Sequence, residues 1–582
     1  MSGVVRRLSR AFVRPCPSVR PFYTGDTCEK QSETHGPIEP RVRRYGVLCM
    51  KRRDFLRASA AGGAAAVGAS VWTRRANAVP FGEIPSDKAS SMLPENLRAQ
   101  SVLECFLYGG LIPWETYYAR PGLGENNETF AYTNYAQMIK ASEGCGFTEA
   151  GSTKTFTEFA TDTAGQEIYF GPYMGRLMAR PDIMKRLRVV INRHTLSPHE
   201  AAIPLVASGR TLGNPALAGL STHVNRYFVD RDTAGDHPPP FSYGFVGGSN
   251  FVNNDGVLSL IAQGLHPGSA RPLNIKLDAA ARLTALLNRP TVGSVDERKQ
   301  FDALLNVYFQ QYAARLKREG GSSAVRAAKF SELLQASITQ SKTDVIQSVL
   351  EANDFLPMQT EKTCERVLGV PPNLTFDTDP NSWGQTPNPT FGNLPAMNLR
   401  MATHLLTHEK YAARHATVVD VGIRQADGGG GYDTHSDGPW RQATNLNNFL
   451  DHLMMNINTP GENNPRKLDL DKTMVILNSE FGRAPARQNP GGQGRNHWPL
   501  GYAQIYIGGP IREEQRGIYG SIGEDGVATK FTTPAENRIA ALLALGIYPF
   551  DAVAYSGSDA QGETQEGPAA RSIIKRVLGH TV

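Results

Sequence analysis

The sequence predicts an α/β fold in which a mostly parallel sheet is flanked by helices and carries a helical insertion. Five short apolar runs each end in a loop with glycine or histidine, and stretches of helical spacing separate them. This alternation is typical of a parallel sheet that is buried on both faces. A long segment with helical spacing alone predicts the insertion. The five predicted strands are 101–110, 187–194, 416–423, 473–482 and 503–509.

The composition fits one large globular unit with many loops. The chain has 582 residues, of which 40% are hydrophobic and 20% are charged, and both fractions are ordinary for globular proteins. Its 57 glycines and 38 prolines indicate long loops around the sheet. Collagen, a coiled coil and a disordered chain are therefore excluded for most of the sequence.

The N-terminal segment, residues 1–78, differs from the rest of the chain in charge. It contains 15 basic and 5 acidic residues, whereas the remainder has 46 basic and 50 acidic residues. The net charge of +6 therefore arises in the first segment, and the rest of the chain is slightly acidic. Because an acidic chain offers no basic surface to phosphates, we expect no nucleic-acid partner.

The same segment contains a predicted twin-arginine export signal. Arg52 and Arg53 precede a weakly apolar stretch at 58–72, and the small-residue triplet ANA follows at 76–78. The stretch is too short and too rich in glycine to span a bilayer, and the triplet is typical of a cleavage site. We expect cleavage after residue 78, passage through the twin-arginine translocase, and a periplasmic or secreted protein. The alternative interpretation of residues 58–72 is a buried alanine-rich helix. We also expect translation to start at Met50.

After the signal, we expect one α/β domain at 79–582 with a helical insertion at about 275–370. A link rich in proline, asparagine and glycine, residues 369–395, then returns the chain to the sheet. No later run reaches the roughly 20 apolar residues of a membrane helix, so we expect no stable membrane span. The cysteines after residue 78 are widely spaced and odd in number, which predicts neither a disulfide framework nor a cysteine zinc site. They are Cys105, Cys145 and Cys364.

The stretch GGGGYDTHSD at 428–437 follows the third predicted strand, 416–423, and suggests a metal-binding loop. Four glycines allow a sharp turn at the carboxyl end of that strand, where parallel sheets bind ligands. Asp433 and His435 then offer oxygen and nitrogen donors, which suit a divalent ion such as zinc, manganese or calcium. In isolation, the better interpretation is a turn in which Asp433 caps backbone amides.

Two further predicted loops strengthen the metal hypothesis. SEFGR places Glu480 and Arg483 just after an apolar strand, and GRNHWP places Arg495 and His497 before the next one. Acidic and imidazole donors would then converge from separate strands, with Asp433, His435, Glu480 and His497 holding one ion. Alternatively, Glu480 forms a salt bridge with Arg483, and His497 packs as an aromatic side chain.

Four other histidines have less support as ligands. His194 and His199 are five residues apart after a predicted strand, which is not the helical ligand spacing, and a structural polar role is preferred. His404 and His408 are four apart on a predicted helix, but no acidic motif accompanies them. We interpret this second pair as surface or core histidines.

These motifs together resemble the bacterial domain-of-unknown-function family 1501, whose twin-arginine-exported, sulfatase-like members are placed with the alkaline phosphatase superfamily. The resemblance covers most of the chain after residue 78. It rests on the twin arginines, GG and ET after the first strand, RHTLSPHEAA, GYDTHSD, SEFGR and GRNHWP. It implies an alkaline phosphatase-like fold in which these loops hold metal and bind the anion.

The resemblance also implies roles for further residues. Glu115 and Asn496 stand where the family has aspartates, and they would complete a second metal position. Arg483 or Arg495 would bind the anion through a bidentate fork. The nucleophile is the missing part, since the sulfatase signature is absent after residue 78. The hydroxyls of Thr116 and Ser197 are candidates, although either residue is more often a turn or capping residue.

Two classes of function follow. The first is an exported metal-dependent hydrolase of phosphate or sulfate esters, which would act on a small anionic ester. The alternative is an exported, non-catalytic protein that binds a glycan, an anion or a partner protein on the same fold. The acidic and histidine loops favour the hydrolase, whereas the missing nucleophile and Asn496 favour the binding protein.

Overall fold

The computed structural model describes the sheet, its helices and the loops at the sheet edge. The predicted export segment and nearly all of the predicted insertion lie outside the described residues, as do Cys145, Cys364 and the four glycines at 428–431. The described residues are 81–120, 157–171, 174–211, 218–229, 231, 242–247, 273–277, 307, 395–409, 412–421, 432–435, 440–486, 488, 494–551 and 554–582.

The core of the fold is an eight-stranded mixed sheet in the order β12-β4-β11-β8-β1-β7-β5-β6. Strand β11 is antiparallel to β4 and β8, and the other neighbouring strands are parallel. The predicted α/β class with a mostly parallel sheet is thereby confirmed. The strands are β1 (Ser101–Leu107), β4 (Leu187–Asn192), β5 (Ser242–Gly247), β6 (Leu273–Leu277), β7 (His415–Asp420), β8 (Thr473–Asn478), β11 (Tyr502–Gly508) and β12 (Gly517–Tyr519).

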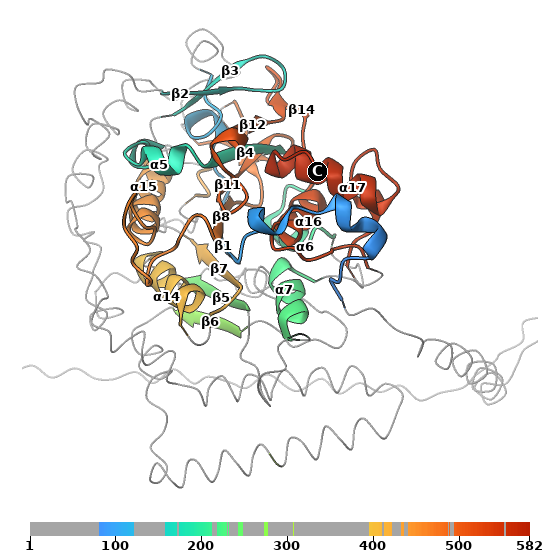
Figure 1. Cartoon of the computed structure of the whole chain (residues 1–582). Coiled ribbons are helices and arrows are strands. Elements are labelled where there is room, and N and C mark those ends of the chain that lie inside the picture. The colour runs from blue at the N-terminus through green and yellow to red at the C-terminus, as the bar shows by residue number, and fades with distance from the viewer. Residues whose placement is uncertain are drawn as a thin grey trace, which may run out of the picture. The chain divides into compact units, whose positions relative to one another are not determined.

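Helices cover both faces of this sheet, with α14 and α15 on one side and α6, α16 and α17 on the other (Figure 1). The α-helices are α4 (Gly175–Met178), α5 (Pro181–Met184), α6 (His199–Ser208), α7 (Leu220–Val229), α14 (Pro395–Thr407), α15 (Trp440–Met455), α16 (Pro534–Ala544) and α17 (Glu566–Ile573), followed by the π-helix η9 (Ile574–Leu578). The short 3₁₀ helices are η1 (Ser86–Ser91), η2 (Glu95–Leu97), η3 (Pro113–Glu115), η7 (Glu513–Gln515) and η8 (Gly557–Asp559). No helix among the described residues is long and apolar enough to cross a membrane.

The central strand β1 shows why both faces need cover. All seven of its residues are buried, and successive side chains point to opposite faces. Leu103 packs in the same core cluster as Leu399 of α14, whereas Val102 packs in the cluster that contains Ile539 of α16. The near-continuous apolar runs of the sequence therefore fold as strands between two helical layers.

Among the described residues, three small two-stranded sheets lie outside the main sheet. The pair that matters for the site is β9 (Gly482–Arg483) and β10 (His497–Trp498), which places His497 opposite Arg483. This hairpin leads from the end of β8 to the start of β11, so it lies at the edge where the parallel strands β1, β7 and β8 end. The other two pairs are β2 (Thr157–Thr161) with β3 (Glu167–Phe170), and β13 (Ser521–Ile522) with β14 (Ala528–Lys530).

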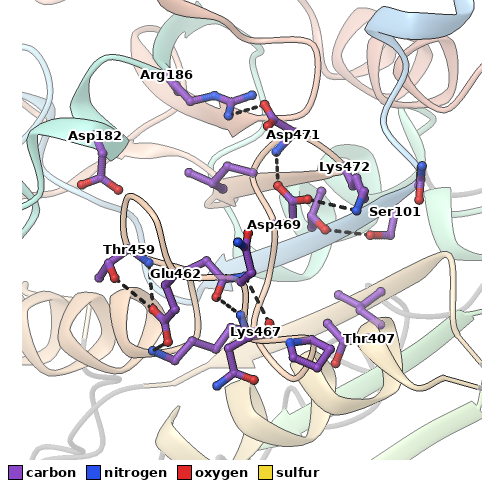
Figure 2. A pocket seen from close by; sticks show the side chains of 18 of the residues that line it. Ser101, Asp182, Arg186, Thr407, Thr459, Glu462, Lys467, Asp469, Asp471 and Lys472 are labelled. Carbon is purple, nitrogen blue, oxygen red and sulfur yellow. Dashed lines mark hydrogen bonds and ion pairs between the residues drawn. The ribbon is translucent and has the colours of Figure 1, made fainter.

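The opposite edge of the sheet holds a polar cavity of about 710 Å³ (Figure 2). Ser101 and Thr473, the first residues of β1 and β8, line it and contact each other through their hydroxyls at 3.0 Å. Its charged side chains pair with one another, as in the 2.7 Å contact between Lys467 and Glu462 (Figure 2). This cavity therefore lies at the amino ends of β1 and β8, away from the loops that the sequence singled out.

Candidate metal centre

Three side chains from different loops meet at the carboxyl edge of the sheet. His199 is the first residue of α6 after β4, Asp433 follows β7, and His497 lies in β10. One ligand atom from each residue lies within 4.8 Å of the others. The Nε2 atoms of His199 and His497 are each 3.4 Å from a carboxylate oxygen of Asp433. Two imidazoles and a carboxylate are typical zinc ligands, so these residues form a possible three-residue metal site.

The burial and the contacts of the His199 imidazole are those expected of a metal ligand. Its Nε2 atom is buried, faces Oδ2 of Asp433 and forms no aligned hydrogen bond. The side chains of His199, Asp433 and His497 are 11%, 15% and 17% exposed, so the cluster is largely desolvated yet still reachable from solvent. A buried nitrogen without a hydrogen bond is costly unless something else binds it, and an ion between these groups would do so.

Gly109 allows the loop of Asp433 to approach the end of β1. Its φ angle is +116°, and a Cβ atom there would lie 2.3 Å from the backbone nitrogen of Asp433. Its own backbone N–H donates a 2.8 Å hydrogen bond to Oε1 of Glu480, after β8. The glycine pair after the first strand is therefore needed for close contact between three loops.

Gln442 on α15 fixes two of these loops and was not predicted as a site residue. It is fully buried, and its side-chain oxygen accepts a hydrogen bond from the backbone N–H of Ile112 at 2.9 Å. Its side-chain nitrogen donates to the carbonyls of Gly110 and Tyr432, both at 2.7 Å. A lone glutamine on a helix carries no sequence signal for such a role, because only the tertiary structure supplies its partners.

The neighbours of Asp433 hold its carboxylate in the charged form. Burial opposes its ionisation, but the imidazoles of His199, His435 and His497 and the Arg483 guanidinium hold its pKa well below the ordinary value. Arg483 is fully buried and forms an ion pair with Asp433. Asp433 is therefore an anion at neutral pH.

The two other histidines near Asp433 differ in exposure. His435 is 35% exposed, and its Nε2 atom lies 3.2 Å from Oδ1 of Asp433 and 2.8 Å from Nε2 of His497. Its Nδ1 atom lies 2.8 Å from the side-chain oxygen of Gln488. His497 stacks on Phe481 with ring centres 4.3 Å apart, and burial lowers the pKa of its imidazole. His435 thus lies beside the cluster, although it is not one of its three members.

Glu480, the remaining predicted ligand, contacts His199 rather than Asp433. Its Oε1 atom lies 2.7 Å from Nδ1 of His199, and Oε2 accepts a 3.1 Å hydrogen bond from the hydroxyl of Ser479. Burial of His199 lowers its pKa, but the carboxylates of Asp433 and Glu480 outweigh this effect and raise the pKa to about 9. The neighbouring His194 lies 2.7 Å from the backbone carbonyl of Glu480, and burial lowers its pKa to about 4.

The residues predicted for a second metal position are not members of the three-residue cluster. Glu115 is fully buried, and its Oε1 atom lies 3.2 Å from Nη2 of Arg495. Arg495 also donates to the carbonyls of Ala484, at 3.1 Å, and Pro485. Asn496 is exposed, and its side-chain oxygen accepts a 3.1 Å hydrogen bond from its neighbour's backbone N–H. A second metal position at Glu115 and Asn496 stays a prediction.

Two of the predicted catalytic side chains, those of Thr116 and Arg483, contact backbone carbonyls. The Thr116 hydroxyl is buried and donates a 2.7 Å hydrogen bond to the carbonyl of Ile112. Ser197 is exposed in the loop between β4 and α6, two residues before His199. Arg483 donates to the carbonyl of Arg495 at 3.0 Å. Their roles as nucleophile or anion ligand therefore stay predictions.

The side chains that the sequence analysis set aside lie away from this cluster. His404 and His408 pack together on and just after α14 with ring centres 5.3 Å apart, and burial lowers the pKa of His404 to about 4. Cys105 is a buried free thiol in β1, and burial raises its pKa. Neither the histidine pair nor the thiol contributes a ligand to the three-residue cluster.

Comparison with known proteins places the chain in a family without giving it an activity. No curated protein and no solved structure matched this chain. One family model, described as "Protein of unknown function (DUF1501)", matches residues 259–570, which is more than half of the chain. The matched range includes Asp433 and His497, whereas His199 lies before it. The chain belongs to the DUF1501 family of proteins of unknown function.

Proposed function

We propose that the protein is an exported, divalent-metal-dependent hydrolase of phosphate or sulfate esters, related to the alkaline phosphatase and sulfatase superfamily. The observation that carries this proposal is the cluster of His199, Asp433 and His497 at the carboxyl edge of a mostly parallel sheet. Ligands of such sheets gather at this edge. The order of the loop motifs along the chain supports the proposed superfamily relationship.

Each member of the cluster has a defined part in the proposed site. The imidazoles of His199 and His497 would bind the ion through Nε2, and Asp433 would supply a negative oxygen. A bound divalent ion would supply Lewis-acid stabilisation of the ester oxygens. Arg483 would limit the negative charge of Asp433, and the exposed imidazole of His435 would accept or donate a proton at the open side of the cluster.

Metal content and ester hydrolysis test the proposal together. The purified protein should bind zinc, manganese or calcium and hydrolyse an aryl phosphate or aryl sulfate, and a chelator should remove both properties. His497→Ala should bind the metal much less tightly and lose most of the hydrolysis, because two protein ligands hold an ion much less tightly than three. His404→Ala is the matched control and should keep both. A metal-free wild-type protein, or hydrolysis that survives the chelator, would overturn the proposal.

A specific observation favours the binding protein as a second candidate. The predicted nucleophile Thr116 donates its hydroxyl to a backbone carbonyl, and the guanidinium of Arg495 is occupied by carbonyls and by Glu115. A site that binds metal and an anion or glycan without turnover would have this arrangement. Stoichiometric metal with no hydrolysis of either aryl ester would support this candidate, and measurable turnover would exclude it.

Export is the part of the proposal that rests on the N-terminal sequence. We propose that the twin-arginine translocase carries the folded chain to the periplasm or outside the cell, and that cleavage follows residue 78. Sequencing of the mature protein should begin at Val79. Replacing Arg52 and Arg53 together with lysine should retain the precursor in the cytoplasm. Unchanged export of this double variant would contradict the proposed route, whereas the metal site would be unaffected.

A further inference from the structure

Glu480 lies beside the candidate metal centre, and we infer that it positions His199 without binding the ion itself. This inference rests on the proposed metal site and assigns Glu480 a different role from the one predicted from the sequence. The carboxylate is fully buried, so its contacts within the protein determine what it does. A residue in this role controls the affinity of the metal through the orientation of another ligand.

Glu480 is held in place from two sides. The backbone N–H of Gly109 donates to Oε1 at 2.8 Å, and the hydroxyl of Ser479 shares its proton between Oε2, at 3.1 Å, and the carbonyl of Leu107, at 2.9 Å. These donors come from the ends of β1 and β8, two neighbouring parallel strands. The carboxylate is therefore fixed relative to the sheet before it contacts His199.

The same oxygen that accepts from Gly109 lies 2.7 Å from Nδ1 of His199. A carboxylate accepts hydrogen bonds, so the Nδ1 position of the imidazole carries the proton. The other ring nitrogen, Nε2, is then the one that faces Oδ2 of Asp433 at 3.4 Å. This is the carboxylate–histidine–metal arrangement, which orients the ring and makes its free nitrogen a stronger ligand.

The backbone of Glu480 fixes the loop that carries His199. Its carbonyl accepts a hydrogen bond from Nε2 of His194 at 2.7 Å, because the backbone N–H of Leu196 donates to the other ring nitrogen at 3.1 Å. His194 and His199 lie at the two ends of the segment between β4 and α6. Glu480 thus contacts this segment at both ends, once through its backbone and once through its side chain.

These contacts indicate the class of ion. With Glu480 directed at His199, the ligands are two imidazole nitrogens and one carboxylate oxygen. Nitrogen-rich sets of this kind suit zinc and similar transition ions, whereas calcium and magnesium prefer oxygen. The structure therefore assigns Glu480 the role of a positioning residue in a zinc-type site.

A double-mutant cycle on the full protein tests this role. Zinc affinity is measured by competition with a chromophoric chelator in the wild type, Glu480→Gln, His199→Ala and the double variant. Glu480→Gln should weaken zinc binding by about 10- to 100-fold, the usual loss when such a partner is changed. In the His199→Ala background the same change should have no further effect, because Glu480 acts through that ring. Glu536→Gln, a change to another fully buried glutamate, is the matched control and should keep wild-type affinity.

Cobalt spectra and a zinc-bound crystal structure separate positioning from direct ligation. If Glu480 only positions His199, cobalt-loaded Glu480→Gln keeps the visible spectrum of the cobalt-loaded wild type, because the ligand set is unchanged. If Glu480→Gln does not fold, a crystal structure of the zinc-soaked wild type decides. A Glu480 oxygen within about 2.2 Å of the ion overturns the inference. Retention of its contact with Nδ1 of His199 supports it.

The outcomes for this inference and for the proposed function are distinguishable. A wild type that binds zinc, with Glu480→Gln equal to it or additive with His199→Ala, overturns the positioning role and leaves the proposed hydrolase intact. A wild type that binds no zinc, manganese or calcium overturns both. A wild type that binds zinc and hydrolyses neither ester leaves the positioning role intact and overturns only the proposed activity.

Discussion

Replacing Gly109 with alanine would place a methyl group between the end of β1 and the loop of Asp433. The new Cβ atom would lie 2.3 Å from the backbone nitrogen of Asp433 and 2.6 Å from the carbonyl carbon of Tyr432. Ordinary contact begins at 3.4 Å, so the two backbones must separate by about 1 Å. Metal sites tolerate displacements of only about 0.2 Å in their donor distances.

The cost of Gly109→Ala has two parts. A φ angle of +116° is left-handed backbone, which costs a non-glycine residue about 1–2 kcal/mol. The overlap with two backbone atoms adds about 1–3 kcal/mol, as for other overpacked sites. We therefore expect the free energy of unfolding to fall by about 2–5 kcal/mol. Zinc affinity should fall by about 100-fold or more, because Asp433 moves away from both imidazoles.

Gly165→Ala is the matched control for the backbone term. Gly165 has a φ angle of +83°, but a Cβ atom there has no neighbour within 4 Å. Urea unfolding should show a loss of about 1–2 kcal/mol for this control, with zinc affinity unchanged. If Gly109→Ala costs no more than Gly165→Ala and binds zinc as the wild type does, the contact between these loops does not position Asp433.

Two further predictions concern the core. Arg538→Met should lower the free energy of unfolding by about 3–5 kcal/mol at pH 7, because the buried carboxylate of Glu104 would lose its charge partner. In the wild type this carboxylate lies 2.6 Å from the Arg538 guanidinium. A loss below about 1 kcal/mol, measured by urea unfolding, would contradict this prediction. Burial lowers the pKa of His452 in the folded protein to about 4, from the ordinary value of 6.5. As the pH falls below about 6.5, the unfolded chain binds a proton that the folded protein does not bind, so the free energy of unfolding falls. Between about pH 7.5 and pH 5, this residue should lower the free energy of unfolding of the wild type by about 2 kcal/mol. The fall measured for His452→Leu over the same range should therefore be smaller by about 2 kcal/mol, and equal falls in the two proteins would contradict the prediction.

The predicted strands were found because burial on two faces leaves a strong local pattern. The runs that begin at 101 and 473 form β1 and β8, where every residue is buried. Apolar side chains on both faces are required wherever helices cover both sides of a sheet, so this signal survives without knowledge of the topology. The antiparallel direction of β11 was not predicted, because direction depends on the connection and not on the composition of the strand.

The candidate site was predicted in part, because contacts that only the fold creates leave no local pattern in the sequence. Asp433 and His497 were singled out because acidic and imidazole donors in loops beside separate strands could converge on one ion. His199 was interpreted as a structural residue, since its spacing from His194 matches no ligand motif. We infer that its role depends on Glu480, which lies 281 residues away in sequence, through a contact that only the fold creates.

The sheet order explains why sequence alone could not bring His199 to Asp433. His199 follows β4 and Asp433 follows β7, and the three strands β11, β8 and β1 lie between them. At about 4.8 Å per strand, the ends of β4 and β7 are about 19 Å apart, far beyond the reach of a shared ion. The two loops must therefore converge over the ends of β8 and β1. Glu480 after β8 contacts the first loop, and Gly109 after β1 allows the second to approach, so the candidate metal centre would depend on two residues that need not bind the metal.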